Sequence, residues 1–70
     1  MILPKDPVML LSVVNTELRD RYPSLEELAK AYGVTEQEIT DQLALIKYEY
    51  QPETNQFHKE EIVWIHLSLS

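Results

Sequence analysis

The chain has 70 residues and no cysteine, which limits it to one small domain without disulfides or thiolate metal sites. Twelve Asp and Glu residues outnumber six Lys and Arg residues, giving a formal net charge of −6. This charge disfavours nucleic acids and anionic membranes as partners, because binding to them depends on Lys and Arg.

The apolar residues near the N-terminus are interrupted by two prolines and by Lys5 and Asp6. The longest uninterrupted apolar stretches there, residues 8–11 and 13–14, are too short for a secretory signal or a membrane span. We therefore expect a cytoplasmic protein that does not enter the membrane.

A first helix is predicted to begin at Pro7 and to stop before Pro23. Asp6 can cap its first turn, and Pro7 at the first helical position loses only an N–H that would be unpaired there. The apolar residues that follow at helical spacing define its buried face: Leu10, Leu11, Val14, Leu18 and Tyr22.

Two short helices joined by a tight turn are predicted next. Ser24 with Glu27 and Thr35 with Glu38 have the spacing of capping boxes, and Gly33 between them suits a left-handed helix end. The expected buried residues are Leu25, Leu28, Ala29 and Tyr32 on the second helix, then Ile39, Leu43 and Ile46 on the third. The pattern indicates a helix, a turn and a helix.

A β-hairpin is predicted after the third helix. Tyr48 and Tyr50 alternate with Glu49, which is typical of a strand. Residues 52–55 are of types common in turns, and Asn55 tolerates a positive φ. Residues 56–58 would form the second strand of the hairpin. The predicted fold is thus mainly α (α+β): a three-helix helix-turn-helix core with a C-terminal hairpin over residues 1–58. Residues 59–70 form an apolar tail whose alternation favours a strand, which could be the third of the sheet; a helix over residues 59–67 is the alternative.

The second and third helices resemble the helix-turn-helix of many bacterial repressors. The resemblance rests on seven positions: Leu28, Ala29, Gly33, Val34, Thr35, Ile39 and Leu43. A small Ala29 allows the helices to approach, and Val34 and Ile39 fill the space between them. With a hairpin in the position of a wing, the chain resembles a small winged helix-turn-helix domain, which implies DNA binding.

The charges oppose that implication. The outward positions of the third helix are Glu36, Gln37, Glu38, Thr40, Asp41 and Gln42, and no Lys or Arg occurs between Tyr48 and His58. A DNA-reading helix contacts bases with its first residues while nearby Lys and Arg hold phosphates. We therefore expect a non-catalytic protein-interaction module in which Glu36, Glu38 and Asp41 meet a basic partner. A DNA-binding transcriptional regulator is the alternative.

A closer resemblance is to a family of short bacterial proteins classed as a domain of unknown function. It extends from about residue 3 to residue 57, and its most specific part is the opening LPKDPxMLLSxxNxxLRD. In proteins of that family glycine commonly stands where this chain has Lys47. A lysine can end a helix there, but it is less suited than glycine to a left-handed conformation. The resemblance implies the fold without implying an activity.

A polar stripe on the first helix is a second candidate partner-binding site. Ser12, Asn15 and Arg19 share one helical face, and Arg19 could anchor a carboxylate or phosphate of the partner. The alternative is a solvated face, with Arg19 paired locally and Asn15 bonded to the hairpin or to a helix end.

The sequence predicts no catalytic, cofactor or metal site. His58, Glu60, Glu61 and His66 have no diagnostic metal spacing, and nucleophile–base pairs and phosphate-binding glycine loops are absent. Tyr48, Tyr50 and Phe57 could stack on single-stranded nucleic acid, but an aromatic cluster that locks the hairpin onto the helices is favoured.

The last prediction is a homodimer whose contact includes the apolar tail, with Ile62, Trp64, Ile65 and Leu67 at the contact. Residues 62–69 are more apolar than a lone terminal strand can bury, and Met9 and Val13 form a second apolar edge on the first helix. The alternative is a monomer in which the tail pairs with residues 56–58 and covers Met9 and Val13.

Overall fold

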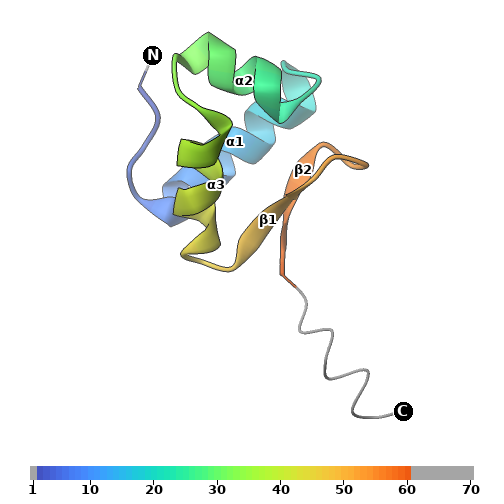
Figure 1. Ribbon diagram of the computed structural model, residues 1–70. Coiled ribbons are helices and arrows are strands. Elements are labelled where there is room, and N and C mark those ends of the chain that lie inside the picture. Colours follow the sequence, from blue (N-terminus) through green and yellow to red (C-terminus); the bar gives the residue numbers. More distant parts are fainter. Residues whose placement is uncertain (1, 61–70) are drawn as a thin grey trace, which may run out of the picture.

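The computed structural model describes residues 2–60, which form three helices followed by a two-stranded antiparallel hairpin. The helices are α1 (Pro7–Asp20), α2 (Leu25–Tyr32) and α3 (Glu36–Ala44), and the strands are β1 (Tyr48–Gln51) and β2 (Gln56–Lys59). The mainly α, α+β fold with a helix-turn-helix and a following hairpin is thus confirmed. The hairpin lies beside the three-helix cluster (Figure 1).

Side-chain caps hold the helix starts, although α2 has only one of the two hydrogen bonds of its predicted capping box. The N–H of Met9 donates to Asp6 Oδ2 at 3.0 Å, and the N–H of Glu27 donates to Ser24 Oγ at 3.2 Å. At α3 both halves of a capping box are present, because Thr35 Oγ1 accepts from Glu38 N and Glu38 Oε2 accepts from Thr35 N. Local side-chain chemistry therefore sets where each helix begins.

The turns between elements use backbone conformations that few residues adopt. Gly33 ends α2 in the left-handed region with φ 71°, as predicted. Asn55 has φ 55° at the last position of the hairpin turn, and Lys47 has φ 66° between α3 and β1. Glycine at position 47, as the family resemblance implies, would adopt this conformation without the steric penalty that a lysine side chain brings.

One hydrophobic core joins all three helices to β2. Its buried members are Leu10, Val14 and Leu18 of α1, Leu25, Leu28 and Ala29 of α2, Ile39 and Leu43 of α3, and Phe57 of β2. The predicted faces are therefore correct at their centres, while Leu11, Tyr22, Tyr32 and Ile46 are only half-buried. Tyr22 and Ile46 lie beyond the helix ends, which explains their exposure.

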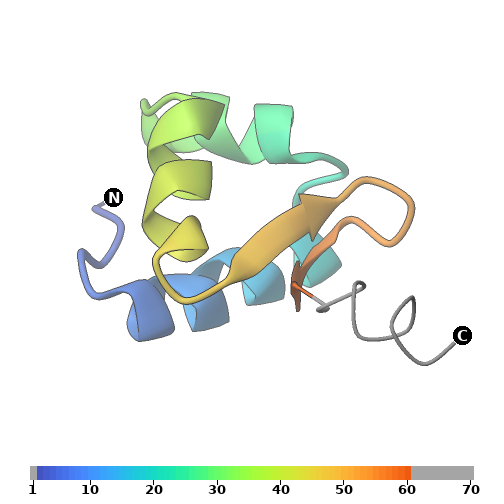
Figure 2. The same cartoon turned by 60° about the horizontal axis from the view of Figure 1, so that its bottom comes forward.

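The hairpin register pairs Tyr48 with Lys59, Tyr50 with Phe57, and Gln51 with Gln56. Tyr50 and Phe57 lie on the inner face with ring centroids 5.4 Å apart. Seen from a second direction, the two strands lie side by side next to the helices (Figure 2). The alternative of a helix over residues 59–67 falls mainly on residues 61–67, which lie outside the described part. Its first residue, Lys59, is the last residue of β2.

Candidate interaction surface

The side chain of Asn15 fastens the hairpin to α1. Its Nδ2–H donates to the carbonyl oxygen of Phe57 at 3.0 Å, and its Oδ1 accepts from the N–H of Phe57 at 2.7 Å. Gln56 adds a bond from its Nε2 to the carbonyl oxygen of Asn15 at 3.0 Å. The amide of Asn15 thus occupies the two backbone groups of Phe57 that an adjacent strand would use.

The other two members of the predicted polar stripe lie at the surface. Ser12 is exposed, and Arg19 pairs with its neighbour Asp20, with Nε 2.9 Å from Oδ1. The hydrogen bond from Arg19 lowers the pKa of the Asp20 carboxyl. The structure therefore matches the alternative interpretation for Asn15 and Arg19, in which one bonds to the hairpin and the other pairs locally.

A second polar network ties the hairpin turn to the end of α1. Tyr50 donates from its hydroxyl to Asn55 Oδ1 at 2.6 Å, and the N–H of Leu25 donates to the same hydroxyl at 3.3 Å. Asn55 Nδ2 donates to the carbonyl oxygens of Leu18 and Tyr22, each at 2.9 Å. The aromatic residues of the hairpin thus attach it to the helices. This is the role that the sequence analysis favoured over stacking on nucleic acid.

The acidic residues of α3 form its outward surface. Glu36, Glu38 and Asp41 are all exposed. Glu38 is committed to the helix cap, and Asp41 Oδ1 accepts from Gln37 Nε2 at 2.7 Å. The acidic surface of α3, meaning these three carboxylates, carries no Lys or Arg within Glu36–Ala44.

Basic residues lie elsewhere on the described part of the chain. Arg21 approaches Glu17 at 3.6 Å and Lys30 approaches Glu26 at 4.0 Å, in addition to the Arg19 pair. The remaining cations of residues 2–60 are Lys5 before α1, and Lys47 and Lys59 at the open end of the hairpin. None of the six therefore belongs to the helix that would enter a DNA groove.

The outer face of the hairpin is also acidic. A shallow depression there is lined by Glu49, Gln51, Glu53, Thr54, His58, Lys59 and Glu60. His58 lies 2.8 Å from Thr54 Oγ1 through its Nε2. Within residues 2–60 no three His, Asp or Glu side chains gather as metal ligands would, and His66 and Glu61 lie outside that range.

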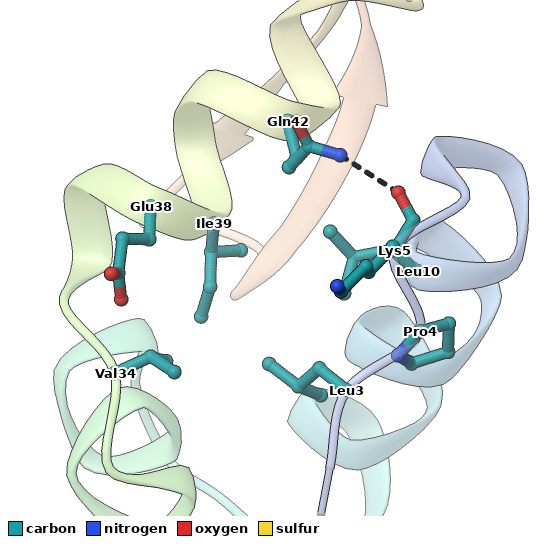
Figure 3. Close-up of a pocket in the computed structure, with 8 residues that line it drawn as sticks. All are labelled: Leu3, Pro4, Lys5, Leu10, Val34, Glu38, Ile39 and Gln42. Atoms are coloured by element: carbon teal, nitrogen blue, oxygen red, sulfur yellow. Dashed lines mark hydrogen bonds between the residues drawn. The ribbon is translucent and has the colours of Figure 1, made fainter.

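An apolar groove separates the N-terminal segment from α3 (Figure 3). It has a volume of about 410 Å³, and Gln42 Nε2 donates to the carbonyl oxygen of Lys5 at 2.8 Å beside it. Its lining residues are Leu3, Pro4, Lys5, Leu10, Val34, Glu38, Ile39 and Gln42. Sequence reasoning missed this groove, because no local pattern shows that the segment before α1 folds back against α3.

Residues 4–57 match the sequence family described as a domain of unknown function, DUF4250. The chain belongs to this family. No curated protein and no solved structure matches the chain. The matched range of this DUF4250 domain includes the three helices, both tyrosines of β1 and the Asn15–Phe57 pair, so the contacts that hold the hairpin to α1 lie within it.

The residues predicted at a dimer contact lie outside the residues that the structure describes: Ile62, Trp64, Ile65 and Leu67. Of the second apolar edge, Met9 is exposed and Val13 is half-buried. No helix within residues 2–60 has both the length and the apolar character needed to cross a bilayer.

Proposed function

We propose that this domain is a non-catalytic protein-interaction module that presents the acidic surface of α3 to a basic partner. The observation that carries the proposal is the position of Glu36, Glu38 and Asp41. All three are exposed on the second helix of a helix-turn-helix, where a DNA-binding relative would present groups that read bases.

The electrostatics of this surface favour a cationic protein over a nucleic acid. Carboxylates facing a phosphate backbone are repelled, and in the major groove Asp or Glu can accept a hydrogen bond only from the amino groups of cytosine and adenine. Glu49 and Glu53 on the hairpin are also exposed and add to the negative charge of the domain. A partner with exposed Lys or Arg would gain both long-range attraction and charge-assisted hydrogen bonds.

Two of the three carboxylates are also oriented by hydrogen bonds, which favours recognition. The capping box orients Glu38 and the start of α3, while the bond from Gln37 orients Asp41. Side chains that are ordered before binding lose less conformational entropy when a partner docks. Rigid presentation of charge on a helix is a property that interaction modules use.

The test is capture of partners from a lysate by the full chain and by matched charge variants. Glu36→Gln with Asp41→Asn removes two charges from α3 while leaving the Glu38 cap intact. Glu26→Gln with Glu27→Gln removes two exposed charges from the first turn of α2 and serves as the control. We expect proteins retained by the unmodified chain and by the α2 variant to be lost with the α3 variant and at raised salt.

Two results would contradict the proposal. Equal retention of the same proteins by both variants would show that the acidic surface of α3 is not the contact. Retention of nucleic acid, abolished by nuclease treatment, would favour the alternative of a DNA-binding regulator.

A further inference from the structure

Among residues 2–60, the strand β1 has a neighbouring strand on only one of its two edges. The sheet has two strands in the order β1-β2. In an antiparallel pair, successive residues direct their backbone groups alternately toward and away from the partner strand. The N–H and C=O of Phe57 bond to Asn15 on α1, so they point away from β1.

This alternation identifies the backbone groups on the outer edge of β1. Tyr50 is the register partner of Phe57, so its N–H and C=O point away from β2, and those of Tyr48 do likewise. Within residues 2–60 these backbone groups of Tyr48 and Tyr50 make no hydrogen bond. The outer edge of β1, meaning these four groups, is therefore open to an added strand.

Apolar side chains accompany this open edge. Tyr48 and Tyr50 are half-buried on the inner face of β1, and Ile46 just before it is also half-buried. Leu45, three residues before Tyr48, is 68% exposed. A strand that paired with the edge and carried apolar residues on its inner face would remove apolar surface from water here.

The chain itself contains a segment of that kind. In residues 62–69, Val63, Ile65, Leu67 and Leu69 alternate with Trp64, His66 and Ser68. Alternation of this sort gives a strand one apolar face. Such a strand supplies backbone groups for the edge and apolar side chains for the surface beside Leu45.

The geometry disfavours pairing of this segment with the sheet of its own chain. Only Glu60 and Glu61 separate Ile62 from the end of β2. A direct return would run along the outer edge of β2, where Asn15 already occupies the backbone of Phe57. Reaching the outer edge of β1 instead would require those two residues to pass across the chain where it enters β1, and connections of that kind are rarely seen.

We infer that residues 62–69 of one copy pair with the outer edge of β1 of a second copy. Both copies have the same edge and the same segment, so the exchange is reciprocal and closes as a two-fold dimer. Strand addition at a sheet edge is an established mode of peptide recognition. The inference does not depend on the acidic surface of α3, which lies on a different element.

Cysteine cross-linking tests the arrangement, because the chain has no cysteine of its own. Glu49 lies on the outer face of β1 and faces an added strand at a position without backbone hydrogen bonds, where side chains approach most closely. An equimolar mixture of a Glu49→Cys chain with a His66→Cys or Ser68→Cys chain is oxidised and separated without reductant. We expect a covalent heterodimer, and light scattering should show the unmodified chain as a dimer.

His58→Cys is the matched control. His58 is the register partner of Glu49 and lies on the same face of the hairpin, but it borders the edge of β2. Mixing it with the same tail variants should give far less heterodimer. The inference is wrong if the unmodified chain is a monomer, if His58→Cys cross-links as well as Glu49→Cys, or if a chain carrying both Glu49→Cys and His66→Cys forms only an internal disulfide.

Discussion

The carboxamide of Asn15 satisfies both backbone groups of Phe57, at 3.0 Å and 2.7 Å, and so attaches the hairpin to α1. Phe57 is 2% exposed, which makes it the only core residue that the hairpin contributes among residues 2–60. Asn15 is therefore one of the residues that hold β2, and with it Phe57, against the helices.

The Asn15–Phe57 pair gives the first prediction. Asn15→Ala leaves a part-buried N–H and C=O without their partner, and should lower the free energy of unfolding by about 1–3 kcal/mol. Thr16→Ala, an exposed neighbour on the same helix, should change it little. Urea unfolding followed by circular dichroism measures both; equal stability of the two variants would show that the pair contributes nothing.

Lys47 and Asn55 both have a positive φ, but replacing them with glycine should change the stability of the domain in opposite directions. Lys47→Gly relieves a left-handed strain that exceeds the backbone entropy glycine adds, and should stabilise the domain by about 0.5–1 kcal/mol.

Asn55→Gly relieves a similar strain but removes three side-chain hydrogen bonds, to Tyr50, Leu18 and Tyr22. It should therefore destabilise the domain. Thermal melts of the two variants beside the unmodified chain decide the point; destabilisation by Lys47→Gly would show that its lysine side chain makes a compensating contact.

Gly33 is expected to be the least replaceable turn residue. A Cβ added there would meet nothing within 4 Å, so the penalty is conformational and comes from φ 71°. Gly33→Val should cost at least about 1 kcal/mol, because β-branched residues suit the left-handed region worst. Gly33→Asn should cost less, and a similar melting temperature for both would mean that strain is not the cause.

A change in stability above pH 10 is predicted from Tyr32. Burial raises the pKa of its phenol above the ordinary 10.0, and the charge of Glu17 raises it further. The unfolded chain then releases this proton at a lower pH than the folded chain. The free energy of unfolding should therefore fall as pH rises from about 10 through the folded pKa.

Tyr32→Phe is the variant that isolates this effect. It should show a shallower decline over the same pH range, even if its stability at neutral pH is lower. Urea unfolding at neutral pH and on either side of the ordinary tyrosine pKa gives the comparison. An identical slope for both chains would assign the decline to other groups.

The features that sequence reasoning predicted correctly are those that depend on near neighbours. Asp6, Gly33 and Thr35 act on backbone groups within a few residues, so their spacing alone indicates the helix ends.

The features that the sequence did not predict depend on contacts between residues far apart in the chain. Asn15 and Phe57 are separated by 42 positions in the sequence, and Gln42 and Lys5 by 37. Contacts at such separations cannot be predicted from a local pattern in a single sequence. From the sequence alone, a polar side chain on a helix could therefore either face solvent or form hydrogen bonds with another helix or strand. The groove beside Lys5 had no local signal at all.

We propose that the acidic surface of α3 meets a protein partner and that this domain does not read DNA. Fluorescence anisotropy with mixed-sequence and genomic duplex fragments tests it most directly. At physiological salt we expect no binding at protein concentrations in the micromolar range. Micromolar binding that weakens steeply with added salt, and that is lost when Lys5, Lys47 and Lys59 are replaced by Gln, would contradict the claim.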